Sequence, residues 1–302
     1  MKAWVLHNIG DLHFEDVSKP VPKPGEALVK VKCAGICSSD IPRMFSTGAY
    51  HYPIILGHEF SGETEDGRRV GVFPLLPCFK CESCKQGHYE TCSNYSYIGS
   101  RQDGAFAEYV VVPEWNLVQL PENMSYEAAT LLEPIAVALN AVKRLDLQHI
   151  LNAVVIGNGA VGKLIAMWLS IFGVGTVELL GRSEEQNHTH YDACVEAVGS
   201  VDSLRRCINA VRPNGQIVLV GNPNAEFRLE QTLYWQILRK QINIRGSWNS
   251  RYPIDWQQAI ENVHKLNVED LISHCYSFEE LDKALAMMLS KKEKYCKVVI
   301  KM

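Results

Sequence analysis

The chain has 302 residues, 47% of them hydrophobic and 21% charged, which is enough for two domains with well-buried cores. A formal net charge of -4 without a basic block argues against a nucleic-acid-binding protein. No apolar run approaches the roughly 20 residues that a membrane span needs. The N-terminus also lacks the apolar core of a signal peptide, so we expect a cytoplasmic protein.

The N-terminal part is predicted to form short strands. The stretches MKAWVL, DLHFEDV and EALVKVKCAGI are apolar or alternate in polarity, as half-buried strands do. Residues 53–73 continue the alternation on both sides of Asp66-Gly67, a pair typical of a tight hairpin.

A candidate metal site follows from residues beside these strands. Cys37, Ser39 and Asp40 come just after the third strand. His58 and Glu59 stand at the entrance of the hairpin. A thiolate, an imidazole and carboxylates are the ligand types of a catalytic zinc site with an open coordination position. A single cysteine and a single histidine are more often core or surface residues, so the remainder of the chain must decide.

Four further cysteines indicate a second metal site. They follow the pattern C-x2-C-x2-C-x7-C and are Cys78, Cys81, Cys84 and Cys92. Four thiolates in one compact lobe are the ligand set of a closed tetrahedral zinc site, and an iron–sulfur cluster is the weaker alternative. The lobe, residues 78–92, has too little apolar material for a core of its own, so zinc would fold it and its role would be structural.

A helical pattern covers the end of the first domain. Residues 97–121 again read as strands, and then SYEAATLLEPIAVALNAVKRL has helical periodicity with Ser125 as the N-cap. Glu133 lies in an otherwise apolar face of this segment, just before Pro134. For an ordinary helix, a solvated carboxylate is favoured over one that faces a cation.

From residue 152 the pattern changes to that of a nucleotide-binding unit. The run NAVVIG predicts a strand buried on both faces, and KLIAMWLSIFG predicts a helix. A glycine-rich turn joins them, and glycines at such positions make the turn, admit a pyrophosphate and let the helix pack on the strand. The candidate cofactor-binding residues of this turn are Gly157, Asn158, Gly159, Ala160, Val161 and Gly162.

The end of the next strand bears on the choice of cofactor. An NAD-preferring unit places an acidic residue there to bind the ribose hydroxyls. This chain has Gly181 followed by Arg182 and Ser183, which favours the 2′-phosphate of NADP over NAD. Glu184 and Glu185 follow and would weaken that preference.

The cofactor-binding part is shorter than an ordinary doubly wound unit. Only nine residues separate Gly181 from the next strand-like run, which begins at Tyr191. Nine extended residues reach roughly 30 Å, enough to cross to another strand but too few for a helix on the way. The remaining strands and helices predict a reduced Rossmann sheet of about five parallel strands.

The C-terminal residues contain a strand, a helix and a last strand, KVVIKM, which suggests a return to the first domain. The predicted organisation is a catalytic domain over 1–134, a cofactor-binding domain over 135–265 and a returning segment over 266–302.

Taken together, the motifs resemble the zinc-dependent medium-chain dehydrogenases over nearly the whole chain. The resemblance rests on the Cys37 cluster, GHE at 57–59, the four-cysteine lobe, LEP at 132–134 and GNGAVG at 157–162, in that order. It implies an α/β protein with a mostly-β GroES-like catalytic domain and a Rossmann domain. It also implies a catalytic and a structural zinc, and NADP or NAD as the cofactor.

The resemblance implies that Cys37 and His58 bind the catalytic zinc. Glu59 and Glu133 would be carboxylates that bind or exchange at the same metal, which overturns the solvated interpretation of Glu133. Asp40 would orient the His58 ring.

The resemblance also implies that Ser39 hydrogen-bonds the substrate hydroxyl and passes its proton towards solvent, while the hydride goes to the nicotinamide. His51 is either a later proton relay or a surface histidine. Arg43, Arg101 and Lys297 are candidates for binding a substrate phosphate, and each is equally readable as a surface charge.

The implied activity is the transfer of a hydride between NAD(P) and a polyol or polyol phosphate such as galactitol 1-phosphate, by a dimer or tetramer. One alternative is a zinc-binding module with an impaired cofactor site, which the shortened cofactor half favours. Another is a threonine-type amino-alcohol dehydrogenase.

Overall fold

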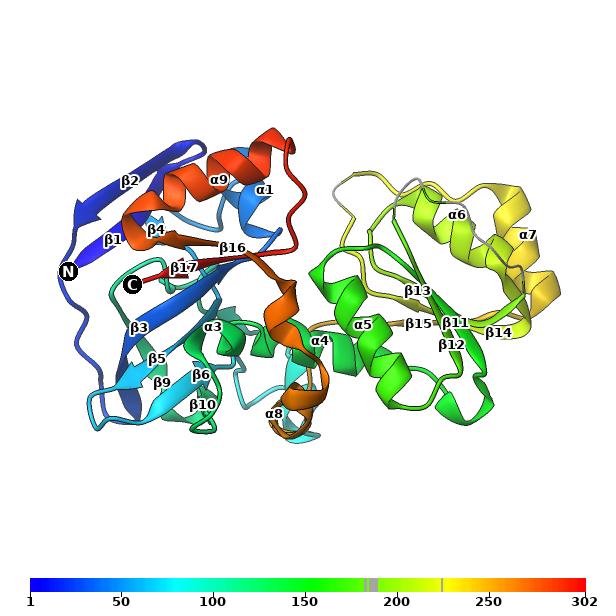
Figure 1. Cartoon of the computed structure of the whole chain (residues 1–302), viewed down its shortest axis with the longest axis horizontal. Coiled ribbons are helices and arrows are strands. Elements are labelled where there is room, and N and C mark those ends of the chain that lie inside the picture. The colour runs from blue at the N-terminus through cyan, green and yellow to red at the C-terminus, as the bar shows by residue number, and fades with distance from the viewer. Residues whose placement is uncertain (182–183, 185–189, 224) are drawn as a thin grey trace. The chain divides into compact units, whose positions relative to one another are not determined.

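The computed structural model describes residues 1–181, 184, 190–223 and 225–302, and it divides into two compact units (Figure 1). The first unit contains Met1–Glu133 and Tyr252–Met302, and the second contains Pro134–Arg251. The return to the first unit thus begins earlier than the predicted residue 266. It begins at Tyr252 because this ring stacks on Phe73 of the first unit, with 4.5 Å between centroids.

The first unit is built mainly from strands. Its central sheet has the order β10-β6-β5-β3-β17-β16, and β9 pairs with β3 outside this path. A second sheet has the order β2-β1-β4, and β7 pairs with β8. The bounds are β1 (Lys2–Asn8), β2 (Asp11–Asp16), β3 (Glu26–Ile36), β4 (Ile54–Ile55), β5 (Glu59–Thr64), β6 (Arg69–Val72), β7 (Leu75–Leu76), β8 (Ser96–Tyr97), β9 (Tyr109–Pro113), β10 (Leu117–Gln119), β16 (Ile272–Ser277) and β17 (Lys297–Lys301).

The predicted hairpin and the predicted return of the last strand are both present. β5 and β6 pair antiparallel on either side of Asp66-Gly67. β17 pairs antiparallel with β3 and parallel with β16, so the C-terminal strand joins the sheet that carries Cys37. One apolar core, which includes Trp4, Phe60 and Phe106, lies between these strands and α9 (Leu281–Ser290).

The helix predicted from Ser125 onward is two helices. Ser125 caps α3 (Tyr126–Ala129), since its Oγ accepts the Ala128 N–H at 3.1 Å. Thr130 follows α3, and α4 starts afresh at Leu132 and ends at Val142. Glu133 therefore lies in the first turn of a helix. The other short helices of this unit are α1 (Asp40–Phe45), α2 (Glu82–Lys85) and α8 (Ile254–Asn262).

The second unit is the predicted reduced Rossmann unit. Within the described residues, its sheet has five strands, all parallel, in the order β12-β11-β13-β14-β15. β12 and β13 thus lie on opposite sides of β11. The elements are β11 (Asn152–Ile156), α5 (Ala160–Ile171), β12 (Thr176–Leu180), β13 (Tyr191–Glu196), α6 (Val201–Ala210), β14 (Val211–Leu219), α7 (Gln231–Lys240) and β15 (Asn243–Gly246).

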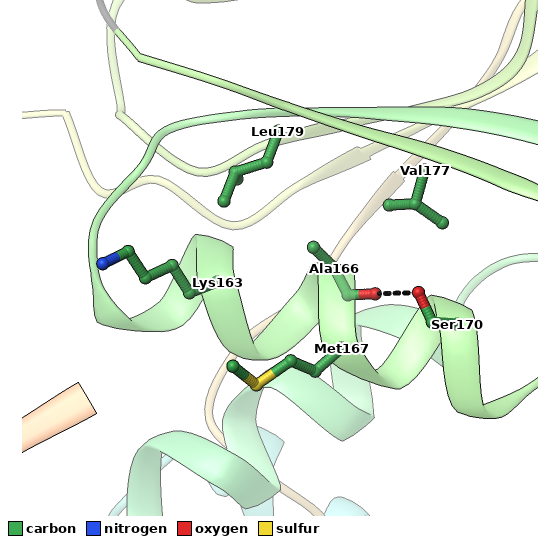
Figure 2. Close-up of a pocket in the computed structure, with 6 residues that line it drawn as sticks. All are labelled: Lys163, Ala166, Met167, Ser170, Val177 and Leu179. Atoms are coloured by element: carbon green, nitrogen blue, oxygen red, sulfur yellow. Dashed lines mark hydrogen bonds between the residues drawn. The ribbon is translucent and has the colours of Figure 1, made fainter. Parts of the chain in front are cut away.

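A groove lies beside α5. Figure 2 shows side chains of α5 and β12 facing this groove, and most of them are apolar. A doubly wound sheet covers such a face with a further helix. The lining residues are Lys163, Ala166, Met167, Ser170, Val177 and Leu179. Among the described residues, no helix is long and apolar enough to cross a bilayer.

Candidate metal and nucleotide sites

The central cluster of the first unit is formed where β3 ends and β5 begins. Cys37 follows β3, His58 precedes β5 and Glu59 is its first residue. One potential ligand atom from each of these three residues lies within 4.8 Å of the other two. The antiparallel pairing places Gly35 opposite Glu59. A Cβ on Gly35 would lie only 2.7 Å from Glu59 Oε2, so a glycine there makes room for the carboxylate.

Asp40 lies beside the His58 ring. Asp40 is completely buried, and its Oδ1 lies 3.3 Å from His58 Nδ1, although without the geometry of a hydrogen bond. Its other oxygen accepts the Cys37 N–H at 3.1 Å. Burial alone would lower the pKa of His58, but Asp40 and the Cys37 thiolate outweigh burial and raise that pKa well above its usual value. With Nδ1 facing Asp40, Nε2 is the nitrogen left for a metal.

Lys297 forms a buried ion pair with Glu59. The lysine is the first residue of β17 and is only 4% exposed, and its ammonium contacts Glu59 Oε2. Burial opposes the charge, but Glu59 and Cys37 raise the pKa of Lys297. A buried, paired ammonium does not bind a substrate phosphate, so that suggestion for Lys297 was wrong. A lysine at the start of the apolar strand KVVI could have indicated a buried and therefore paired charge, although not which residue pairs with it.

Glu133 lies close by but is not one of the three clustered ligands. Its Oε1 accepts a hydrogen bond from the Tyr97 hydroxyl at 3.2 Å. Burial and the nearby Glu59 raise the pKa of Glu133. The Tyr97 ring also lies edge-on to His58, with centroids 5.7 Å apart. Tyr97 is a site residue that sequence reasoning missed, because one tyrosine among several carries no distinguishing pattern.

Ser39 and Arg43 extend the cluster. The Ser39 hydroxyl donates to Cys37 Sγ at 3.3 Å and accepts a hydrogen bond from Arg43 Nη1 at 2.7 Å. Arg101 is held otherwise: its guanidinium lies over the rings of Tyr50 and Tyr95, at 4.5 and 4.2 Å from their centroids. His51 is exposed, and its Nε2 lies 3.2 Å from the Arg101 carbonyl oxygen.

The four-cysteine lobe has the geometry predicted for a closed site. The four sulfurs lie within 4.8 Å of one another. Cys81 Sγ is 3.8 Å from Cys92 Sγ, and the N–H of Cys78 donates to the Cys92 sulfur. The donor types fit zinc in both clusters: four thiolates saturate one, whereas a thiolate, an imidazole and a carboxylate leave a position open in the other.

The glycine turn of the second unit has the expected geometry. Gly157 has φ +130° and turns the chain sharply after β11. A Cβ on Gly162 would lie 1.7 Å from the Gly157 carbonyl oxygen, so only glycine lets α5 pack this closely. A Cβ on Gly159 would have no neighbour within 4 Å, so the backbone there is open to a ligand. Its neighbours Asn158, Ala160 and Val161 complete the turn into α5.

A carboxylate stands at the end of β12. Glu184 Oε2 accepts the Gly181 N–H at 2.7 Å, and Arg206 of α6 donates to the carbonyl oxygens of Gly181 and Glu184. Arg182 and Ser183, on which the predicted preference for NADP depends, lie outside the described residues. Glu184 follows the last residue of β12, Leu180, by four positions, so its carboxylate is a candidate for the acidic residue that binds ribose hydroxyls in such units.

Comparison with protein families gives two matches along the chain. Residues 23–122 match the family described as alcohol dehydrogenase GroES-like domain, and residues 132–265 match the family described as zinc-binding dehydrogenase.

Among individual proteins, the chain is 32% identical to galactitol 1-phosphate 5-dehydrogenase of Escherichia coli K12, covering 90% of this chain and 91% of that protein. It is also 32% identical to sorbitol dehydrogenase of Halalkalibacterium halodurans, covering 94% and 95%. The crystal structure of galactitol-1-phosphate dehydrogenase from Escherichia coli superposes with a TM-score of 0.87 at 30% identity and covers all of both chains.

Each of these two alignments has more positions than the number of residues that this chain contributes to it. The alignment with the K12 protein has 315 positions, whereas 90% of 302 residues is about 272, so about 43 positions are gaps in this chain. The sequence itself indicates one short place, the connection of nine residues between Gly181 and Tyr191.

Proposed function

The chain belongs to the zinc-binding dehydrogenases with a GroES-like domain, and we propose that it transfers a hydride between a polyol or polyol phosphate and NAD(P). The observation that carries the proposal is the cluster of Cys37, His58 and Glu59 with Ser39 beside it. The coarser statement, that the chain is a zinc-type polyol dehydrogenase, follows from its relatives.

The zinc chemistry would be arranged by the cluster's own residues. When bound, zinc supplies a Lewis acid that lowers the pKa of a substrate hydroxyl. Asp40 fixes the His58 ring, and Lys297 holds the Glu59 carboxylate by a buried ion pair. Ser39, whose hydroxyl lies 3.3 Å from Cys37 Sγ, would hydrogen-bond the reacting hydroxyl. Glu133 would remain with Tyr97 or exchange onto the metal.

The second unit would bind the dinucleotide. When bound, the nicotinamide supplies the hydride acceptor. The open backbone at Gly159 and the N-terminus of α5 would receive the pyrophosphate. We propose NAD or NADP as the cofactor. Arg182 supports NADP from the sequence, whereas the carboxylate of Glu184 supports NAD.

A turnover screen tests the proposal directly. Zinc-loaded protein is incubated with hexitols, hexitol phosphates and the matching ketose phosphates, each with NAD and NADP and in both directions. We expect turnover of a hexitol or hexitol phosphate. Turnover of an amino alcohol alone would instead support the threonine-type enzyme.

The zinc-binding module is the second candidate, because only nine residues separate Gly181 from Tyr191 and the cofactor half is shortened there. Titration with NADH and NADPH, followed by nucleotide fluorescence, separates the two candidates. No binding of either nucleotide at millimolar concentration would eliminate the dehydrogenase.

We also propose a homo-oligomer, a dimer or tetramer, formed along the β15 edge of the second unit. All four residues of β15 are exposed, and its outer edge pairs with no strand in the described part of the chain. Ile244 and Trp248 add exposed apolar surface, at 36% and 50%. Light scattering that gave the 33.9 kDa mass of one chain would contradict this.

A further inference from the structure

Arg43 places a charged group directly beside the hydroxyl of Ser39. It lies in α1, four residues after Ser39, so one helical turn brings the two side chains to the same face. Its Nη1 donates to Ser39 Oγ at 2.7 Å and to the Ser39 carbonyl oxygen at 3.0 Å.

Only one nitrogen of the Arg43 guanidinium is used in this way. A guanidinium carries five N–H donors and no acceptor. Nη1 uses its two donors on Ser39, and no hydrogen bond or ion pair of Nε or Nη2 occurs within the described ranges. The side chain is 25% exposed, so three donors remain available to a ligand.

The remaining donors are rigidly placed relative to the reacting position. The guanidinium is planar and rigid, and its Nη1 is bonded to the Ser39 hydroxyl. Nε and Nη2 of the same group are therefore held close to that hydroxyl. On the proposed function, the hydroxyl to be oxidised meets Ser39. The oxygen substituent on the neighbouring carbon of the substrate then falls within reach of Arg43.

We propose that Arg43 recognises the hydroxyl on the carbon next to the carbinol carbon, so that the enzyme selects vicinal diols over simple secondary alcohols. This inference rests on the proposed function and narrows it to a substrate class. Asp40 favours a neutral hydroxyl over a phosphate at this position. Its buried carboxylate lies 3.7 Å from Arg43 Nη1 and offsets part of the positive charge.

The test compares two substrates that differ by one hydroxyl, 2,3-butanediol and 2-butanol, in the wild type, Arg43→Met and Arg43→Lys. The wild type should prefer the diol in kcat/KM. Arg43→Met should lower kcat/KM for the diol by about 10- to 100-fold, the usual range for one hydrogen bond to a charged group. Both substrates lose the hydrogen bond from Arg43 to Ser39, so kcat/KM for 2-butanol should fall by a smaller factor than kcat/KM for the diol, and Arg43→Lys should retain part of the preference because it keeps a donor.

Arg68→Met is the matched control, because Arg68 lies in the same unit and pairs at the surface with Asp66 and Glu114. Arg68→Met should leave kcat/KM unchanged for both substrates. Metal analysis and a thermal melt of each variant verify folding and zinc content. If Arg43→Met fails to fold, Arg43→Lys and Arg43→Gln carry the comparison. A thermal melt of the zinc-loaded protein with and without the diol measures diol binding without turnover. The wild type should be stabilised by the diol, and Arg43→Met should not.

Two results would overturn the proposal while leaving the dehydrogenase intact. One is a wild type that turns over both substrates equally well. The other is an Arg43→Met variant that loses both substrates by the same factor, since Arg43 would then serve only to position Ser39. A wild type that oxidises no alcohol with either nucleotide would reject the proposed function and this inference with it.

Discussion

Cys37 and Cys33 lie close together in the chain, one after β3 and the other within it, yet only Cys37 belongs to a group of potential metal ligands in the described ranges. This pair therefore gives a controlled test of the catalytic zinc. Cys37→Ala should reduce the metal content from two zincs to one per chain. Loss of a residue that supports a metal ligand lowers activity by up to about 100-fold. Loss of the ligand itself should lower activity by more than this.

The control for this variant is Cys33→Ala, which removes a buried thiol from within β3 and should retain both zincs. Metal analysis after dialysis measures the outcome. Two zincs retained by Cys37→Ala would refute the assignment of the catalytic site.

Two neighbouring residues give opposite predictions for cofactor preference. If Arg182 binds a 2′-phosphate, Arg182→Ala should weaken NADPH more than NADH. If the Glu184 carboxylate accepts the ribose hydroxyls, Glu184→Gln should weaken NADH by about 10-fold and leave NADPH unchanged or improved. Fluorescence titration of both variants with both nucleotides decides between them. The exposed Glu261 supplies a charge-matched control, Glu261→Gln, which should leave both affinities unchanged.

Asp192 makes the stability of the second unit sensitive to acid. Its carboxylate accepts the N–H groups of Leu151 and Asn152 and pairs with Arg212 at 2.6 Å. Burial opposes ionisation, but these partners outweigh it and lower the pKa of Asp192. A lowered folded pKa means that the stabilisation is complete above the unfolded pKa of about 3.9 and is lost as the pH falls through the folded pKa.

Asp192→Asn should therefore reduce the free energy of unfolding by about 1–3 kcal/mol at pH 7, and the deficit should shrink towards pH 3. Urea unfolding of both proteins at the two pH values measures it. Asp202→Asn, which removes a carboxylate that is 83% exposed, should change little at either pH. An equal deficit for Asp192→Asn at both pH values would show that its charge is not the cause.

Among the elements, the four-cysteine lobe is linked to the body of the first unit by aromatic contacts. Phe79 and Tyr89 of the lobe lie edge-on to Trp115, with centroids 5.0 and 5.1 Å away. Cys84→Ser should remove the structural zinc, and because the lobe has little core of its own, the lobe should unfold. The fluorescence of Trp115 should then change.

Trp115→Phe identifies that signal among the six tryptophans of the chain. Cys275→Ser, which alters an exposed cysteine outside the lobe, is the matched control and should leave the spectrum and the zinc content unchanged. A Cys84→Ser protein with two zincs and an unaltered spectrum would contradict the structural role.

Elements with a regular local pattern could be predicted from the sequence, whereas their tertiary partners could not. The stretch EALVKVKCAGI is β3 from Glu26 to Ile36, because alternation marks a strand wherever it pairs. The segment after Ser125 has one continuous helical periodicity of apolar residues, so the sequence predicts one helix. The break at Thr130 does not interrupt that periodicity and could not be predicted from it. The pairings of Lys297 with Glu59 and of Tyr97 with Glu133 join residues far apart in the chain, so no local pattern contains them.

For the molecule as a whole, the two chemistries reside in separate units. Each unit has its own apolar core. The clustered candidate zinc ligands belong to the first unit, and the glycine turn and Glu184 belong to the second. Loss of one site should therefore leave binding at the other site unaffected, although turnover requires both.

Gly159 allows this independence to be tested from the cofactor side. It is the N-cap of α5 with φ -86°, a value open to any residue, and a Cβ there meets no neighbour. Aspartate is a favourable N-cap, so Gly159→Asp should fold and remain as stable as the wild type. Its carboxylate would repel the pyrophosphate, however, and should weaken NADH and NADPH by about 10- to 100-fold.

Gly159→Ser is the matched control, because serine is also a good N-cap but carries no charge. It should retain most of the nucleotide affinity. Gly159→Asp should keep both zincs. Cys37→Ala should bind NADH with an affinity within about twofold of the wild type, because the substitution lies in the first unit and leaves the glycine turn unchanged. Loss of zinc from Gly159→Asp, or of NADH from Cys37→Ala, would show that the two sites depend on each other for binding and not only for turnover.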